Sequence, residues 1–161
     1  MKTCVFAGTF DPFTTGHEYV VEKGLKLFDK VVIAVGVNND KKPLFSLEER
    51  IKILKTIYQD NVNVEVKEFS GLLVDFMKQN GYTIYIRGVR NEEDYKYENT
   101  MHKFNLDFYK DLITVYIPTP NELEHVSSSA VKSIVNMNAD FEMYLPKKSV
   151  GVVKEILKLK K

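Results

Sequence analysis

The sequence predicts an α/β fold: a doubly wound, five-stranded parallel sheet with helices on both faces. Short apolar runs rich in β-branched residues alternate along the chain with segments whose apolar residues recur at helical spacing. Strands that alternate with helices imply right-handed crossover connections, and therefore a parallel sheet that is covered on both faces. No repeat, linker or low-complexity stretch interrupts the alternation, so a single domain over residues 1–161 is expected.

The first elements follow from apolar patterning. The run 4–7 is predicted to be a buried strand, and a glycine-containing loop leads from it into a helix with Val20, Val21 and Gly24 on its inner face. Residues 31–37 form a nearly unbroken β-branched run, which is typical of a strand covered on both faces.

The middle of the chain carries clear helix boundaries. The capping box Ser46-Leu47-Glu48-Glu49 begins a helix that continues to about Tyr58. The run 62–66 alternates apolar and polar residues and predicts a third, partly exposed strand. The next helix covers about 72–79, because Asn80-Gly81 is typical of a helix C-terminus.

The rest of the chain continues the pattern. Strands are expected over 82–86 and 112–117, on either side of a long helix over about 91–109. Further helices begin at Ser127 and near Pro146. The long helix carries an apolar face that is most simply a core or oligomer contact, formed by Tyr95, Tyr97, Met101, Phe104 and Phe108.

Composition narrows the class of protein. A chain of 161 residues that is 44% hydrophobic and 28% charged is an ordinary globular chain, long enough to bury a core. Lys+Arg 23 against Asp+Glu 22 gives no overall basic field, so a nucleic-acid partner is not expected. The single cysteine, Cys4, lies in an apolar run and is predicted to be a buried core thiol. Neither a membrane-spanning stretch nor a signal-peptide pattern is visible, so a cytoplasmic protein without a membrane partner is expected.

The loop 8–17 carries the strongest functional signal. It follows a predicted strand, opens a helix, and contains Thr9, Asp11, Thr14 and His17. Free N–H groups and the positive end of the helix dipole favour an anion at such a position. Because a histidine in the first turn adds a directional donor, the loop is predicted to be a phosphate site with a chemical group built into it.

Other loops should meet at the same edge, because ligands of parallel α/β sheets bind beyond the carboxyl ends of the strands. The second loop, 38–43, offers Lys41 and Lys42, and the third, 69–73, is small and apolar. The fourth is Arg87-Gly88-Val89-Arg90, and the fifth leads to a serine run, 127–129, that opens a helix. Cations, hydroxyls and two helix N-termini on one rim predict a polyphosphate site.

Several familiar signatures are missing from the sequence. Neither the P-loop pattern G-x-x-x-x-G-K-[ST] nor the dinucleotide pattern G-x-G-x-x-G occurs. The histidines His17, His102 and His125 lie far apart in sequence without a carboxylate cluster, so a zinc site is not expected.

Four motifs in order resemble a known family. Gly8 to His17, ending in Thr14-x-Gly16-His17, is similar to the T/H-x-G-H signature of the nucleotidyltransferase superfamily. The remaining motifs narrow the match: Lys41-Lys42-Pro43, Ile86-Arg87-Gly88-Val89-Arg90 with Asp94-Tyr95-x-Tyr97-Glu98, and Ser127-Ser128-Ser129. Together they resemble bacterial phosphopantetheine adenylyltransferase over essentially the whole chain, which implies the Rossmann-like nucleotidyltransferase fold.

The resemblance implies transfer of the adenylyl group of ATP to 4′-phosphopantetheine, giving dephospho-coenzyme A and pyrophosphate with Mg²⁺. His17 would stabilise the transition state, with Thr9, Lys41 and Arg87 as the other catalytic groups. The phosphopantetheine would bind Thr9, Lys41, Leu73 and Arg87. ATP would bind Thr9, Phe10, His17, Gly88, Val89, Arg90, Glu98, Leu123, Glu124, His125, Val126, Ser127, Ser128 and Ser129. The family also implies a homohexamer regulated by coenzyme A. No dedicated carboxylate cage is visible in the sequence, so the metal is expected to enter on the nucleotide.

Three positions depart from the family pattern. Thr15 stands where asparagine is usual, and Asn138-Ala139-Asp140 lacks the usual glycines. Leu123-Glu124-His125-Val126 replaces a pattern of an aromatic residue, serine, phenylalanine and an aliphatic residue, so the packing around adenine should differ.

Simpler interpretations of the same residues remain open. His17 could merely cap its helix, Lys41 and Lys42 could be solvated loop charges, and one of the three serines could be a plain N-cap. Arg87 and Arg90 could form surface ion pairs with the acidic run 92–94. At the level of function, the rivals are a sister nucleotidyltransferase acting on a nicotinate nucleotide or a polyol phosphate, and a non-catalytic nucleotide-sensing module.

Overall fold

The predicted parallel sheet is confirmed. The computed structural model describes residues 1–37 and 42–161. Its five strands lie in the order β3-β2-β1-β4-β5, and every pair of neighbours is parallel. The strands are β1 (Thr3–Gly8), β2 (Lys30–Gly36), β3 (Val64–Phe69), β4 (Ile84–Val89) and β5 (Ile113–Pro118).

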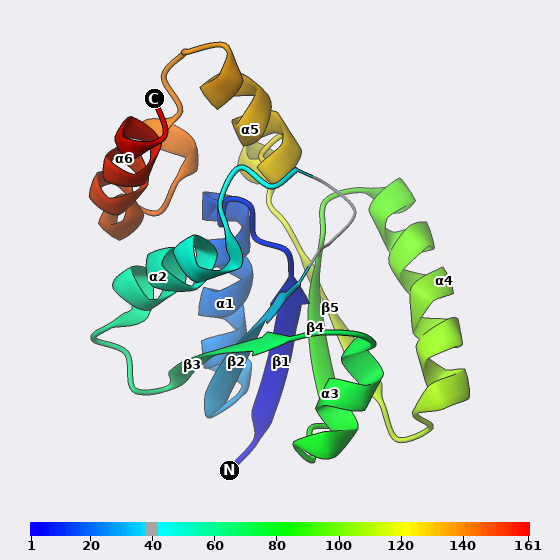
Figure 1. Ribbon diagram of the computed structural model, residues 1–161. Coiled ribbons are helices and arrows are strands. Elements are labelled where there is room, and N and C mark those ends of the chain that lie inside the picture. The colour runs from blue at the N-terminus through cyan, green and yellow to red at the C-terminus, as the bar shows by residue number, and fades with distance from the viewer. Residues whose placement is uncertain (38–41) are drawn as a thin grey trace.

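Helices cover both faces of this sheet (Figure 1). They are α1 (Thr15–Leu27), α2 (Leu47–Tyr58), α3 (Leu73–Gln79), α4 (Glu92–Phe108), α5 (Ser128–Asn136) and α6 (Val150–Leu159). Short 3₁₀ turns connect the later elements: η1 (Asn121–Leu123), η2 (Glu142–Tyr144) and η3 (Lys147–Ser149). Helices α1, α2 and α6 lie on one side, α3 and α4 on the other, and α5 lies beyond the carboxyl ends of the strands (Figure 1).

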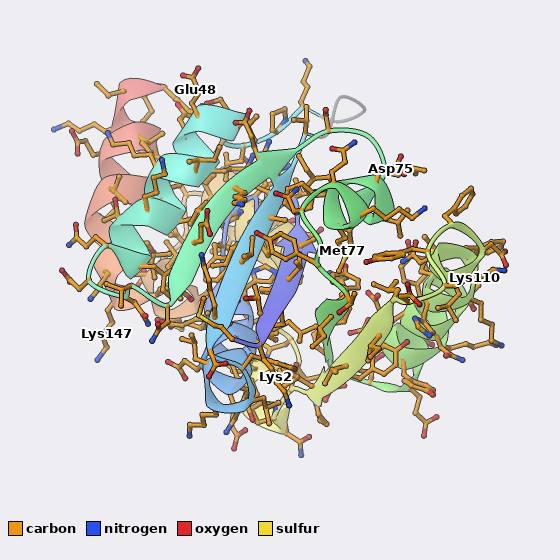
Figure 2. The ribbon with its side chains drawn as sticks, turned by 90° about the horizontal axis from the view of Figure 1, so that it is seen from below. Lys2, Glu48, Asp75, Met77, Lys110 and Lys147 are labelled. Carbon is orange, nitrogen blue, oxygen red and sulfur yellow. The ribbon has the colours of Figure 1, made fainter. Side chains whose placement is uncertain are left out.

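Alternate residues along the strands point to opposite faces of the sheet and pack into two separate hydrophobic cores. Cys4 and Phe6 of β1 pack into the core under α1, α2 and α6, whereas Val5 and Ala7 pack into the core under α3. Met77 of α3 is fully buried in the second core, and Figure 2 shows it beside the sheet. Burial raises the pKa of Cys4 to about 12, so the predicted core thiol is confirmed.

The strand boundaries differ from the prediction, by one residue in β1, β2 and β5 and by two or three residues in β3 and β4. β3 begins at Val64 rather than Val62, because a turn at Asn61 accepts hydrogen bonds from the Asn63 and Val64 amides and leaves Val62 93% exposed. β4 continues to Val89 through pairing with β5, so the predicted fourth loop was wrong for its first three residues. Arg87 therefore stands on a hydrogen-bonded strand rather than in a loop.

The apolar face of α4 is not part of the core. Within the described ranges α4 buries no residue, and Tyr97, Phe104 and Phe108 are 64%, 58% and 57% exposed. The core interpretation of this face was therefore wrong, while the oligomer interpretation stays a prediction. Among the described helices, none is long and apolar enough to cross a membrane.

The order in which strands are added to the sheet changes side at β1. The chain builds outward to β2 and β3 on one side, then returns to place β4 and β5 on the other. The carboxyl ends of β1 and β4 thus form the switch point, which is where ligands of such sheets bind.

Candidate active site

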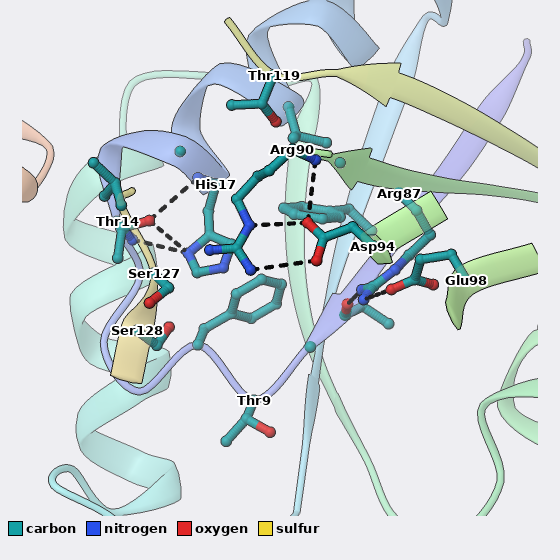
Figure 3. Close-up of a pocket in the computed structure, with 18 residues that line it drawn as sticks. Thr9, Thr14, His17, Arg87, Arg90, Asp94, Glu98, Thr119, Ser127 and Ser128 are labelled. Carbon is teal, nitrogen blue, oxygen red and sulfur yellow. Dashed lines mark hydrogen bonds and ion pairs between the residues drawn. The ribbon is translucent and has the colours of Figure 1, made fainter. Parts of the chain in front are cut away.

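A cavity of about 300 Å³ opens at this switch point. Figure 3 shows its lining, which comes from the ends of β1 and β4 and from α1, α4 and α5. The structure brings together ten of the predicted site residues there: Thr9, Phe10, His17, Arg87, Gly88, Arg90, Glu98, Val126, Ser127 and Ser128.

Other predicted site residues lie outside this cavity. Leu73 begins α3 and packs against the core beneath that helix. The His125 ring lies against Tyr144 instead, with the ring centroids 6.1 Å apart. Lys41 falls outside the described residues. The remaining predicted residues that do not line the cavity are Val89, Leu123, Glu124 and Ser129.

His17 is held by the N-terminus of its own helix. The Thr14 amide donates to His17 Nδ1 at 2.9 Å, and the His17 amide donates to Thr14 Oγ1 at 3.4 Å, a reciprocal capping box. The capping interpretation of His17 is therefore confirmed, but it uses only one ring nitrogen. Because Nδ1 accepts the hydrogen bond of the Thr14 amide, the neutral ring carries its own proton on Nε2. The ring of His17 lines the cavity beside Arg90 (Figure 3).

The surroundings of His17 keep it neutral. Its ring packs against Phe6, Phe10 and Phe13, with centroids 6.1, 5.1 and 5.2 Å away. Burial, together with the smaller effect of the positive charges of Arg87 and Arg90, lowers the pKa of His17 to about 3. His17 is thus a neutral hydrogen-bond donor at physiological pH rather than a cation or a proton-transfer group.

We expect the free energy of unfolding to fall as pH decreases below about 6.5. His17 in the unfolded chain takes up a proton there, while His17 in the folded chain stays neutral until pH reaches about 3. The contribution is fully present above pH 6.5 and is lost towards pH 3, at up to about 1.4 kcal/mol per pH unit. Urea midpoints measured at neutral and acidic pH should fall more steeply for the wild type than for His17→Ala; equal slopes would contradict a neutral, buried His17.

Arg87 reaches across the switch point. Its Nη1 donates to the Ala7 carbonyl of β1 at 2.8 Å, and its Nη2 pairs with Glu98 of α4 at 2.5 Å. Burial alone would lower the pKa of Arg87, but Tyr85 and Glu98 outweigh it and raise this pKa above its usual value. Within residues 1–37 and 42–161 the buried Nε has no hydrogen-bond partner.

Arg90 is fixed from the start of α4. Its Nε donates to Asp94 Oδ2 at 2.9 Å, and its backbone amide donates to the same oxygen at 3.1 Å. The ion-pair interpretation is therefore confirmed for Arg90 with Asp94. Asp94 and Thr119 also line the cavity, although the sequence assigned them no role there. For Asp94 the available signal was its spacing of four residues after Arg90 at a helix N-terminus.

The N-terminus of α5 closes another side of the cavity. Ser127 is its N-cap and accepts the Ala130 amide at 3.1 Å, so the plain-cap interpretation holds for this serine. Ser128 Oγ donates to the Pro12 carbonyl at 2.8 Å and ties α5 to the first loop. Two helix N-termini, those of α1 and α5, therefore face one cavity, as the loops predicted.

Asp11 does not face the cavity, although it belongs to the first loop. Its carboxylate is buried and accepts the Leu44 and Phe45 amides, each at 2.8 Å. Lys132 of α5 pairs with the same carboxylate at 3.1 Å. Asp11 therefore joins the first loop to the segment before α2 and to α5.

We expect Asp11→Asn to lower the free energy of unfolding by about 1–3 kcal/mol. An amide cannot accept from both neighbouring N–H groups as a carboxylate does, and it leaves Lys132 without its charged partner. Urea denaturation measures the loss. Asp107→Asn, which removes the same charge at an exposed position, is the control and should change stability by less than about 0.5 kcal/mol; an equally small loss for Asp11→Asn would contradict this role.

The described side chains at the site were expected to leave the metal to the nucleotide, and their chemistry can be compared with that of a metal cage. Among the described residues no group of three or more His, Cys, Asp or Glu side chains could hold an ion. The two carboxylates that line the cavity, Asp94 and Glu98, are paired with arginines. The described side chains therefore do not form a protein-only magnesium site.

Comparison with known proteins identifies the class first. The cytidylyltransferase-like family model matches residues 5–134. A solved bifunctional NMN adenylyltransferase/ADP ribose pyrophosphatase from Francisella tularensis, in complex with AMP and a manganese ion, superposes with a TM-score of 0.71 at 16% identity. That match covers 97% of this chain and 49% of the solved chain, so this chain spans about half the length of that protein. The fold and family model define a nucleotidyltransferase.

Curated relatives identify the family within this class. The phosphopantetheine adenylyltransferase of Cytophaga hutchinsonii is 42% identical over 91% of this chain and 98% of its own. That of Clostridium botulinum (strain Eklund 17B / Type B) is 40% identical over 95% of this chain and 96% of its own. The chain belongs to the phosphopantetheine adenylyltransferase family.

Proposed function

We propose that this protein transfers the adenylyl group of ATP to 4′-phosphopantetheine, giving dephospho-coenzyme A and pyrophosphate in coenzyme A biosynthesis. Membership of the adenylyltransferase family supports the reaction. The observation that carries it is the neutral His17, held at a helix N-terminus in a cavity that also contains Arg87 and Arg90.

The reaction requires alignment more than acid–base chemistry. A phosphate oxygen of 4′-phosphopantetheine attacks the α-phosphorus of ATP, a new phosphorus–oxygen bond forms, and the bond to the pyrophosphate oxygen breaks. Because the attacking oxygen is already anionic, neither a protein nucleophile nor a strong base is needed. This requirement agrees with a site whose histidine is neutral and whose two carboxylates, Asp94 and Glu98, are paired with arginines.

Each reactant has a proposed side of the cavity. Arg87, which lines the cavity from the end of β4, binds the acceptor phosphate through its planar guanidinium. Thr9 positions the attacking oxygen, and Lys41 offsets the repulsion between the two anions. Leu73 stays a prediction for the pantetheine arm.

The nucleotide is proposed to occupy the side nearer α1 and α5. His17 Nε2–H donates to the α-phosphate, where negative charge grows in the transition state. Arg90 and the free amides of the α5 N-terminus hold the β- and γ-phosphates. The other predicted ATP contacts, Phe10, Gly88, Val89, Glu98 and residues 123–129, stay predictions.

Magnesium is proposed to enter with ATP. Mg²⁺ is commonly held by substrate phosphates with few protein ligands, and the described side chains offer no cage of their own. When bound it would neutralise phosphate charge. No role of a residue named above depends on it.

Assembly and regulation stay further proposals. The exposed apolar face of α4, formed by Tyr95, Tyr97, Met101, Phe104 and Phe108, supports self-association because such faces usually mark protein–protein contacts. That the assembly is a homohexamer follows from the family resemblance. Feedback by coenzyme A follows from the family resemblance alone, and the cytoplasmic location stays a prediction from the sequence.

An acceptor panel tests the proposed function. Pyrophosphate release from Mg·ATP would be measured with 4′-phosphopantetheine, pantetheine, nicotinate mononucleotide and glycerol 3-phosphate. We expect pyrophosphate release from Mg·ATP with 4′-phosphopantetheine and with none of the other three acceptors. Faster release with another acceptor would assign a sister activity, and ATP binding without release to any acceptor would favour a nucleotide-sensing module.

A further inference from the structure

Arg50 of α2 is a buried cation that lies beneath the cavity rather than in its lining. It is 3% exposed and donates to three backbone carbonyls. Its Nη1 lies 2.7 Å from the Thr9 oxygen and 3.0 Å from the Gly36 oxygen, and its Nε lies 3.3 Å from the Phe45 oxygen. These carbonyls come from the loop after β1, the end of β2 and the segment before α2.

Burying a charged guanidinium in this way has a desolvation cost that a purely stabilising role does not readily explain. Burial lowers the pKa of Arg50 and the nearby Asp11 carboxylate acts in the opposite direction, so a charge is held in a poorly solvated position. Well-packed apolar side chains often stabilise a core as much as a buried charge network does. The buried guanidinium of Arg50 is more easily explained by the backbone segments that it holds in position.

The contact with Thr9 explains what Arg50 positions. Thr9 lines the cavity, and its carbonyl accepts a hydrogen bond from Arg50 Nη1. The next residue, Phe10, has φ 53, in the left-handed region that a bulky residue adopts only when its surroundings enforce it. Asp11, one residue further, is anchored to the same segment as Arg50, through the Phe45 amide. The loop is thus fixed from below at both ends of its strained residue.

We propose that Arg50 is a positioning residue for adenylyl transfer: it fixes the Thr9 turn relative to His17 and Arg87 without touching either substrate. The proposal deepens the proposed function and rests on it for its kinetic readout. A displacement of about 1 Å in a group that aligns reactants can cost about 10²-fold in rate. Arg50 is the described side chain that links Thr9 directly to the end of β2.

Arg50→Lys is the first test. Lysine keeps the charge, but its single ammonium lacks the planar fork that serves Thr9, Gly36 and Phe45 together. We expect kcat to fall about 10- to 100-fold while the KM for ATP changes by less than about threefold. Lys52→Met, an exposed change on the same helix, is the control and should leave both constants unchanged. If Arg50→Lys does not fold, Arg50→Gln, which keeps one N–H donor group, takes its place with the same expectation.

Double-mutant cycles separate positioning from a merely structural role. Because Arg50 acts through Thr9, Arg50→Lys should change kcat by less than about threefold in a Thr9→Ala background. In a His17→Ala background it should keep its full effect. Equal losses in both backgrounds, or a loss that follows only the fraction of folded protein, would overturn the proposal.

Nuclear magnetic resonance gives a readout that does not need activity. The Thr9 carbonyl carbon and the Phe10 amide should shift or broaden in Arg50→Lys, while the corresponding signals of β5 should not. If the wild type releases no pyrophosphate with 4′-phosphopantetheine, the proposed function fails but the spectra still decide the role of Arg50. Unchanged Thr9 and Phe10 signals would refute it.

Discussion

Replacing His17 with alanine should lower kcat by a factor of about 10²–10³, equivalent to about 3–4 kcal/mol of transition-state stabilisation. The neutral imidazole donates from Nε2, because Nδ1 already accepts the Thr14 amide. A donor aimed at the α-phosphate gains most when that group becomes pentacoordinate and its charge increases. Its removal should therefore change the affinities for ATP and 4′-phosphopantetheine much less than kcat.

The structure indicates that His17→Ala will still fold. Thr14 keeps its own cap contact with the amide of residue 17, and alanine is a good helix former. His102→Ala, a change of another histidine on α4 away from the cavity, is the matched control and should leave kcat unchanged. Near-normal kcat in folded His17→Ala would remove His17 from the mechanism. A variant that only fails to bind ATP would make it a ground-state ligand.

Replacing Arg87 with alanine should weaken 4′-phosphopantetheine binding by about 10- to 100-fold, the loss expected for one or two hydrogen bonds to a charged group. ATP affinity should change by much less. Arg87 stands on the last part of β4, and its contacts with Ala7 and Glu98 hold its guanidinium in place before the substrate arrives. Isothermal titration with 4′-phosphopantetheine and with pantetheine measures the effect on the phosphate alone.

Arg87→Ala also leaves Glu98 without its partner, which could weaken binding by repulsion. The double variant Arg87→Ala/Glu98→Gln removes that charge and should bind 4′-phosphopantetheine about as weakly as the single variant. Arg90→Ala is the complementary variant and should weaken ATP more than the acceptor. If Arg87→Ala weakens pantetheine as much as 4′-phosphopantetheine, Arg87 does not bind the acceptor phosphate.

The sequence could predict the interior of the fold because local patterns encode it. Buried β-branched runs identified β1 and β2, and the Ser46–Glu49 capping box identified the start of α2. The end of β4 was not predictable in the same way. Arg87 and Gly88 resemble loop residues, and what keeps them in the strand is pairing with Tyr116 and Ile117, nearly thirty residues later in the chain.

The sequence predicted those site residues that lie together in one continuous loop or motif. The loop from Gly8 to His17 carried its own signal, and parallel topology placed the later loops beside it. The support beneath the site carried no such signal. Arg50 resembles a surface residue of an amphipathic helix, and its role depends on carbonyls of Thr9 and Gly36 that only the folded chain brings to it. The inward direction of Asp11 depends likewise on amides 33 and 34 residues away.

Pyrophosphate release from Mg·ATP, measured with and without 4′-phosphopantetheine, tests the central claim most directly. Adenylyl transfer at the His17 cavity predicts negligible release from ATP alone and rapid release when the acceptor is added, with one dephospho-coenzyme A formed for each pyrophosphate. Release that is independent of 4′-phosphopantetheine, or no release with it present, would contradict the claim.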